Sequence, residues 1–377
     1  MVRSPARSRS ADLPASASRA IVRDYSRGNA KPYDVEFDVR TLYDFLFSLS
    51  DVFSLSDNVG TTEDLVAADR RWLAEARTQL EARAGDALDR APTELCVRLA
   101  GLAVDRPTVG DAAGFVELLH QLDDTTIVRT IVGDDLRDPE RRAMTERALA
   151  GDEEAVTALV ATLGDSHPED TVGRMARIYR DPGSIIEPAR RIMTEWLPLY
   201  RTIEPRIGRM IRRDHDSRAR AIATLRPTDL IEATTGGVRW LAEPGVRRVI
   251  LAPSYFARPY NFVLGGDDWR MFGYPIADEA LDGGDPQAPP AAVIRLHRAL
   301  GDETRLRILR LLVGRDHYLT EIASALELSK PTIKHHLALL RAAGLVTLTE
   351  EGGLSYYSLR RGTVETNGAG LIDYLLG

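Results

Sequence analysis

The chain has 377 residues, 44% of them hydrophobic, and a formal net charge of −7. That length allows about two or three domains with a substantial core. No apolar run approaches the roughly 18 residues of a membrane-spanning helix, so no membrane association is expected. The single cysteine, Cys96, excludes an intramolecular disulfide and a cysteine-rich metal site. We therefore expect a reducing, cytoplasmic compartment and a buried thiol.

The first part of the chain is predicted to be a helical domain behind a disordered tail. Residues 1–30 are rich in Arg, Ser and Ala and lack the apolar core of a secretory signal. Alternating apolar residues then predict a strand over 35–39. An apolar stripe with helical spacing predicts an amphipathic helix over 40–54. Proline and glycine breaks divide a further, mainly helical region over 62–224.

A short β-rich section follows the helical region. Branched and aromatic residues predict strands at 249–251, 260–264 and 269–274. Gly265, Gly266 and Asp267 supply turn residues between the last two strands, which favours a β-hairpin. The fold class is therefore predicted as mainly α, with a short antiparallel sheet in the N-terminal domain.

Composition also indicates where the domains divide. The run ADEALDGGDPQAPP at 277–290 is typical of a linker. It separates a domain over 31–276 from a second domain over 291–377. Within 291–361 there are 11 Lys or Arg against 7 Asp or Glu, a balance of +4 that leaves −11 for the rest. A basic module on an acidic body is compatible with nucleic-acid binding through that module.

The C-terminal domain is predicted to contain helices whose apolar residues share one face. Asp302 can cap one helix, because its carboxylate accepts free amide protons of the first turn. The predicted buried stripes are Leu306, Leu309, Leu312 and Val313, followed by Leu319, Ile322, Ala323 and Leu326. Leu328 and Ser329 form a turn. Ser329 then caps a helix over 329–343 that tolerates Pro331 in its first turn and ends at Gly344.

The helix over 329–343 has two unlike faces. Ile333, Leu337 and Leu340 are spaced to pack against the preceding helices. The opposite face is predicted to present Lys330, Thr332, Lys334, His335 and Arg341. Strands at 346–348 and 357–359 would follow as a β-wing. This pattern predicts insertion in a DNA major groove. The alternative is a small bundle whose polar face is only solvated.

Three runs carry a resemblance to a known family: RALGDETRLRILRLL, LTEIASALELSKPTIKHHLALLRAAGLV and LSYYSL. Together they resemble winged helix-turn-helix regulators of the ArsR/SmtB type over about 70 residues. The resemblance implies a homodimeric bacterial transcription factor, most often a repressor, that binds an imperfect palindrome in double-stranded DNA. By motif position it implies DNA contacts from Ser329, Lys330, Thr332, Lys334, His335 and His336. Arg341 and the wing residues Gly352, Gly353 and Tyr356 complete the predicted site.

The chain departs from that family's pattern in two places. Metal-sensing members carry cysteines where this chain has Tyr318 and Thr320, and neither supplies the thiolate that a soft metal prefers. We therefore expect no metal and no cofactor. Glu350 and Glu351 place negative charge in the wing, where phosphates would repel it. Arg360 and Arg361 are expected to compensate this negative charge in part.

Two other classes of function remain open. Gly164 to Ser166 superficially resembles the nucleophile block of one esterase class, but a predicted helix precedes it where a strand is needed. We therefore expect no enzyme. A protein-interaction scaffold with a degenerate winged helix is the third class, and the retention of Ser329, Lys334 and His335 argues against it.

The stretch from VRRVILAPSYFARPYNF through YPIADE resembles the long N-terminal extension of some actinobacterial regulators of this type, which implies no particular ligand. We predict a dimerisation or effector domain, and leave open an unknown small-molecule effector. Four aromatic residues are candidates for lining a pocket, although such residues more often belong to the core: Trp240, Tyr255, Tyr260 and Trp269.

Overall fold

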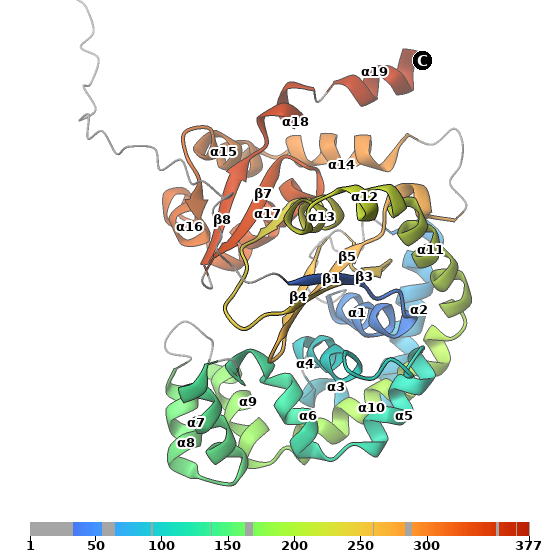
Figure 1. The fold of residues 1–377 in the computed structure, drawn as a ribbon. Helices are drawn as coiled ribbons and strands as arrows, with labels where there is room; N and C mark the ends of the chain where they lie inside the picture. The colour runs from blue at the N-terminus through green and yellow to red at the C-terminus, as the bar shows by residue number, and fades with distance from the viewer. Residues whose placement is uncertain are drawn as a thin grey trace, which may run out of the picture.

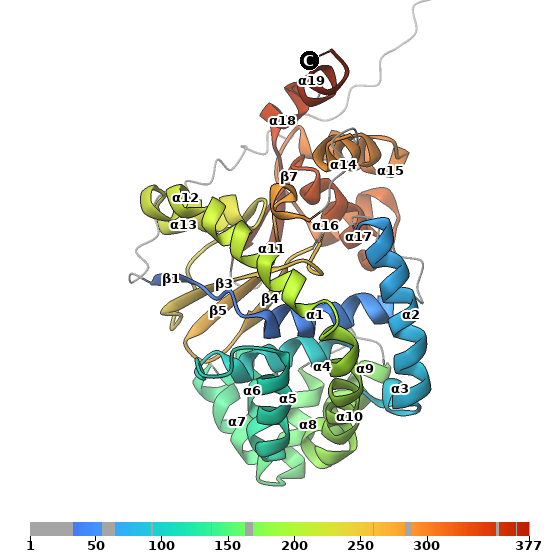
Figure 2. The same cartoon turned by 90° about the vertical axis from the view of Figure 1, so that its right-hand side faces the viewer.

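The computed structural model of the chain is layered. It describes residues 33–54, 65–91, 93–136, 138–162, 169–258, 260–282, 289–351, 354–366 and 368–376. The predicted tail over 1–30 lies outside these residues. A helical bundle, a four-stranded sheet and a winged helix lie one above the other in both views (Figure 1, Figure 2). The predicted class, mainly α with small β elements, is confirmed.

Most of the helices belong to the N-terminal part. The helices below the central sheet in Figure 1 are α1 (Thr41–Ser54), α2 (Ala67–Ala84), α3 (Ala87–Arg90), α4 (Thr93–Arg98), α5 (Ala112–Gln121), α6 (Asp124–Ile131), α7 (Pro139–Leu149), α8 (Glu153–Ala161), α9 (Glu169–Arg180) and α10 (Gly183–Tyr200). Two 3₁₀ turns, Leu99–Ala103 and Gly133–Leu136, lie between them. The chain then rises past the sheet through α11 (Glu204–Ser217), α12 (Ala219–Thr224) and α13 (Pro227–Thr234). None of the described helices is both long and apolar enough to cross a membrane.

The central sheet has the order β1 (Asp34–Phe37), β3 (Arg248–Ser254), β5 (Trp269–Pro275), β4 (Phe262–Gly265). The hairpin of β4 and β5 is confirmed. The prediction of an antiparallel sheet is wrong, because β1, β3 and β5 run parallel. The partner of β1 follows only after the whole helical region, and a long connection of this kind permits parallel pairing.

Both faces of this sheet are covered. Along β3, Ile250 and Ala252 join the core of the bundle, whereas Val249 and Leu251 pack with α13. The helix α1 lies directly beneath the sheet, and residues 42–49 are buried on every side. The apolar stripe predicts an amphipathic helix with one exposed face, but residues 42–49 have no exposed face, because sheet and bundle enclose them. Cys96 is buried as predicted, and burial raises the pKa of its thiol to about 12.

A buried carboxylate fixes α1 to the end of β3. Asp44 accepts hydrogen bonds from Tyr200 Oη at 2.8 Å, Ser254 Oγ at 2.5 Å and the amides of Tyr255 and Phe256 at 2.6 and 3.1 Å. Burial raises the pKa of this carboxyl, and the hydrogen bonds oppose the shift. These hydrogen bonds hold the end of β3 and the two residues that follow it against α1.

The winged helix forms the top layer. It comprises α14 (Ala291–Leu300), α15 (Glu303–Leu312), β6 (His317–Tyr318), α16 (Leu319–Leu326), α17 (Lys330–Ala342), β7 (Val346–Glu351), β8 (Leu354–Leu359), α18 (Arg361–Glu365) and α19 (Ala369–Leu376). It has its own apolar core, built from α14 to α17 and the two wing strands. The predicted wing is confirmed, with Val346 opposite Leu359 and Leu348 opposite Tyr357.

A strand of the N-terminal part completes the sheet of the winged helix. The strand β2 (Val238–Trp240) runs parallel to β7 and gives the order β2, β7, β8, β6. The Leu348 amide donates to the Gly237 carbonyl at 3.0 Å. An edge strand exposes unpaired backbone groups, and β2 satisfies those of β7. The two parts of the chain therefore share a sheet, which was not predicted; the boundary before Ala291 stays a prediction.

Gly237 offers a test of this junction. Its φ is +113°, and a Cβ there would lie 3.0 Å from Arg360 Nη2. We expect Gly237→Ala to lower the free energy of unfolding by about 1–3 kcal/mol, because a side chain strains this backbone conformation. Chemical denaturation of the full chain measures the change. Gly314→Ala is the control, since Gly314 has no positive φ and open space around it. Equal destabilisation by both variants would contradict a special role for Gly237.

Candidate nucleic-acid interface

Local capping sets the geometry of the helix-turn-helix. Asp302 caps α15 as predicted, its carboxylate accepting the Arg305 amide at 2.8 Å. The Tyr318 amide donates to Glu321 at the start of α16, at 2.9 Å. That helix ends at Glu327, whose φ of +56° is the left-handed conformation of a helix terminus. The chain thus turns sharply before α17.

Ser329 begins α17 as predicted. Its hydroxyl accepts the Thr332 amide at 3.3 Å and lies 2.7 Å from Thr332 Oγ1. Pro331 occupies the first turn, where its missing N–H has no partner to lose. Ile333, Leu337 and Leu340 are fully buried against the preceding helices. The inner face of the helix is therefore confirmed.

The outer face is exposed only over its first two turns. The exposed side chains there are Ser329, Lys330, Pro331, Thr332 and Lys334. A hydroxyl, a second hydroxyl and two ammonium groups thus gather at the N-terminal end of α17. Such an end also carries partial positive charge from the aligned peptide dipoles. This surface, residues 329–334, is called the α17 tip below; its contact with DNA stays a prediction.

His335 contacts the N-terminal part instead of lying fully outward. Its Nδ1 is 3.2 Å from the hydroxyl of Tyr260, which lies just before β4. The ring is half-buried. Of the four aromatic pocket candidates, Tyr260 therefore reaches the candidate site, whereas Trp240, Tyr255 and Trp269 belong to the core.

His336 points toward α15. Its Nδ1 lies 3.8 Å from Asp302 Oδ1. Burial lowers the pKa of His336; Asp302 opposes the shift, and Arg305 adds to it. The neutral form of the ring is thus favoured. The ring faces Asp302, the N-cap of α15, rather than the α17 tip.

Arg341 corrects the predicted outer face. Its side chain is 7% exposed, and Nη1 donates to the Thr235 carbonyl at 3.2 Å. Arg341 lies four residues after Leu337 and next to Leu340, so its side chain lies near the buried face of α17. The end of α13 lies there. The prediction that Arg341 faces outward to phosphates is wrong.

The wing is largely tied into the fold. Gly352 and Gly353 lie outside the described residues. Tyr356 lies on β8 as predicted, but its ring is buried against Tyr318 with centroids 4.0 Å apart. Arg360 pairs with Glu232 at 3.0 Å, so it is held against α13 and does not offset the acidic wing. Arg361 donates to the Val313 carbonyl.

The sequence does not predict the contacts that Tyr260, Thr235 and Glu232 make with His335, Arg341 and Arg360. Each comes from a loop or helix end, where no periodicity marks a buried partner. The GG pair at 236–237 before a short apolar strand was the only local signal. Among the described residues, no group of three or more His, Cys, Asp or Glu is placed to hold a metal ion. Gly164 to Ser166 lie outside them.

The match to known proteins falls on this same segment. A family model described as bacterial regulatory protein, arsR family, matches residues 302–347. The transcriptional repressor SdpR of Bacillus subtilis is 42% identical over 62 residues, which are 16% of this chain and 69% of SdpR. The regulator CmtR of Mycobacterium tuberculosis is 42% identical over 69 residues, 18% of this chain and 58% of CmtR.

One solved structure adds a similar match. HlyU from Vibrio cholerae N16961 is 32% identical, covering 23% of this chain and 95% of that chain, with a TM-score of 0.19. HlyU is described as a transcriptional activator. These matches each span less than a quarter of the chain, and the chain spans less than two thirds of CmtR. Through its C-terminal winged helix, the chain belongs to the ArsR family of bacterial regulatory proteins.

Proposed function

We propose that this protein is a sequence-specific transcriptional regulator that inserts the α17 tip in the major groove of double-stranded DNA. The observation that carries the proposal is the division of α17. Its inner face is anchored by Ile333, Leu337 and Leu340, while the tip is exposed. In helix-turn-helix proteins the N-terminal residues of the second helix contact base edges. Thr332 and Lys330 are placed for bases, and Lys334 for a phosphate.

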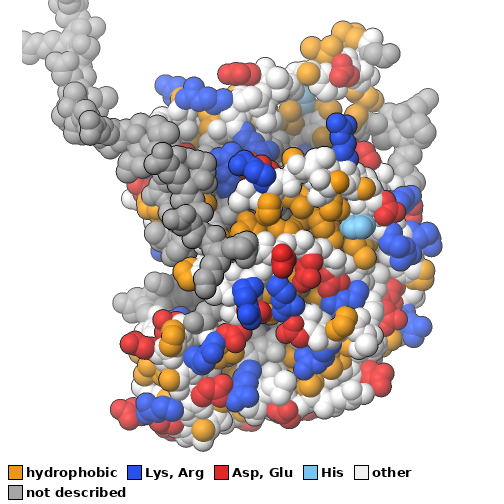
Figure 3. All heavy atoms as spheres, in the orientation of Figure 1, with side chains coloured by type: hydrophobic (Ala, Val, Ile, Leu, Met, Phe, Trp, Pro, Cys, Tyr) orange, Lys and Arg blue, Asp and Glu red, His pale blue; other side chains and the backbone are white. Residues whose placement is uncertain are grey.

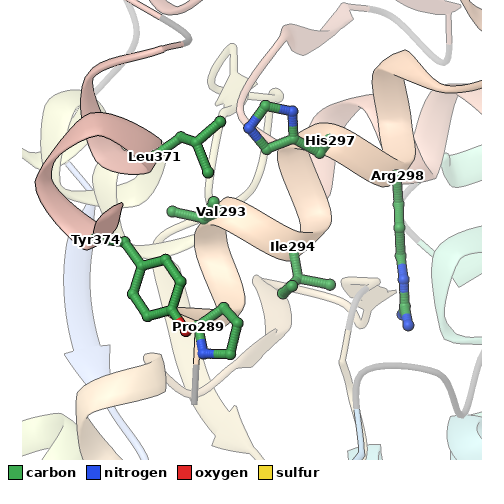
Figure 4. A pocket seen from close by; sticks show the side chains of 7 residues that line it. All are labelled: Pro289, Val293, Ile294, His297, Arg298, Leu371 and Tyr374. Atoms are coloured by element: carbon green, nitrogen blue, oxygen red, sulfur yellow. The ribbon is translucent and has the colours of Figure 1, made fainter. Parts of the chain in front are cut away.

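We also propose a homodimer formed through α14 and α19. Large apolar side chains are exposed on α19, with Leu375 63% and Leu376 82% exposed. In Figure 3 hydrophobic side chains gather at this upper edge. Leu371 and Tyr374 of α19 point toward Val293 and Pro289, around a mostly apolar cavity of about 460 Å³ (Figure 4).

A second copy is the occupant that suits this surface. An isologous contact covers the same patch on both copies. Binding of both copies to successive major grooves requires the two α17 tips to lie ~34–36 Å apart, one DNA turn, and the two-fold symmetry would be matched by an imperfect palindrome. Repression is the proposed sign; SdpR is named a repressor, whereas HlyU is named an activator.

A scaffold with a degenerate winged helix is the second candidate. The observation that favours it is the engagement of Arg341 and His335 by the N-terminal part. The exposed tip favours the regulator. DNA binding by the full chain separates the two.

Lys334→Ala tests the phosphate contact. We expect weaker binding on every DNA sequence and a salt dependence whose slope falls by about one unit, because one counterion fewer is released. Fluorescence anisotropy over a range of salt measures the slope. Arg209→Ala is the charge-matched control on the exposed side of α11. An unchanged slope for Lys334→Ala would remove this residue from the phosphates.

Thr332→Ala tests base reading. We expect lost preference at a single base position, worth about 1–3 kcal/mol, with other positions unaffected. Binding to a panel of singly substituted operators measures it. Ser324→Ala, an exposed hydroxyl on α16, is the control. Uniform loss across the panel would argue against direct readout by Thr332.

Leu375→Asp tests the dimer. A charge in the apolar contact costs its desolvation, so we expect a monomer at concentrations where the unaltered chain is dimeric. Sedimentation velocity reports the mass. Leu225→Asp, at a similarly apolar exposed position outside the winged helix, should leave the dimer intact. A monomeric unaltered chain, or a dimeric Leu375→Asp variant, would sink this arrangement.

A further inference from the structure

A second cavity lies where the N-terminal part meets the winged helix. Its volume is about 240 Å³. The N-terminal part contributes the junction of α11 and α12, the end of α13, and the segments after β3 and β5. The winged helix contributes α14, the end of α17 and the residue before α18. Five arginines line it together with a single acidic residue, Asp278; they are Arg218, Arg258, Arg295, Arg341 and Arg360.

Among the residues that the structure describes, the carboxylates paired with the lining arginines are fewer than the guanidinium groups. Asp278 is shared, pairing with Arg258 at 2.5 Å and with Arg295 at 2.5 Å. Arg218 pairs with Asp214 at 2.8 Å, and Glu232 holds Arg360. Within the described part of the chain, three carboxylates thus pair with four of these guanidinium groups, which leaves positive charge in a partly enclosed space.

One buried donor points to a missing acceptor. Arg258 is 3% exposed; its terminal nitrogens bond to Asp278 and the Ile276 carbonyl, but its Nε has no hydrogen-bond partner. Leaving a charged donor buried and unsatisfied costs free energy. Arg341, which is also buried, lines the same cavity. An oxyanion entering here would supply acceptors where guanidinium groups converge.

We propose that this cavity binds a small phosphate-bearing anion. A phosphate carries about −1.5 to −2 charges near neutral pH, which matches the excess of guanidinium groups. The volume suits inorganic phosphate or a short phosphorylated carbon chain and is below the ~300 Å³ at which drug-sized ligand pockets begin. This site is separate from the DNA surface. Arg341 lies eleven residues along α17 from Lys330, about 16 Å at the helical rise.

The position of the cavity gives the anion a regulatory role, and this part of the inference rests on the proposed function. Arg295, Arg341 and Arg360 belong to the winged helix, whereas Arg218 and Arg258 belong to the N-terminal part. A ligand held by both sets stabilises the arrangement in which α17 contacts Tyr260 and Thr235. By linkage, the anion and DNA then change each other's affinity by the same factor.

Isothermal titration calorimetry of the full chain with inorganic phosphate and with glycerol 3-phosphate tests the site. Sulfate, succinate and chloride at equal ionic strength separate a phosphate site from a general anion effect. We expect saturable binding of at least one phosphate probe, weakened about tenfold or more in Arg360→Gln, since a charged hydrogen bond is lost. Arg239→Gln is the matched control, because Arg239 pairs with the same Glu232 at 2.8 Å and does not line the cavity.

The outcomes separate the site from its role. No saturable binding of either phosphate probe up to ~10 mM, equal binding of chloride, or equal loss in both variants would overturn the site. Arg341→Gln provides a second variant, expected to weaken binding likewise, with its folding checked by circular dichroism. Phosphate binding without any change in DNA affinity would overturn the regulatory role alone. A chain that binds no DNA would defeat the proposed function, while calorimetry still decides the anion site.

Discussion

The parallel pairing of β2 with β7 is the constraint on which the arrangement of this molecule depends. Backbone hydrogen bonds between strands have a fixed spacing and register, so β2 fixes the wing strand relative to α13 and the central sheet. Arg360 with Glu232, and Arg341 with Thr235, add side-chain contacts beside it. Strand pairing and side-chain contacts therefore hold the winged helix against the N-terminal part.

This attachment divides α17 into a covered half and an exposed half. Its C-terminal half is covered by α13 and by the loop that carries Tyr260, while the α17 tip remains exposed. A helix that is anchored at its C-terminal half and exposed at its N-terminal end offers few side chains to a DNA groove, but holds them in a fixed orientation. Preorganisation of that kind reduces the entropy lost on binding. It also means that any change at the junction is transmitted to the orientation of α17.

Much of the winged helix could be predicted from sequence, because its signals are local. Ser329 as a cap, the 333–337–340 stripe and the hairpin of β7 and β8 each follow from residue spacing. The long-range contacts carry no such signal. The parallel partner of β1, the strand β2 and the burial of Arg341 depend on segments about a hundred residues or more away. An arginine is expected at the surface, yet Arg341 is buried and donates to the Thr235 carbonyl at the end of α13.

Sequence-specific DNA binding is the claim on which the functional account stands. The most direct measurement is the affinity of the full chain for a DNA fragment selected from genomic sequence, compared with a scrambled duplex of equal length. At ~150 mM salt, where phosphate contacts alone are weak, the account predicts binding at least about a thousandfold tighter to the selected fragment. Equal affinity for both duplexes would contradict it and favour the interaction scaffold.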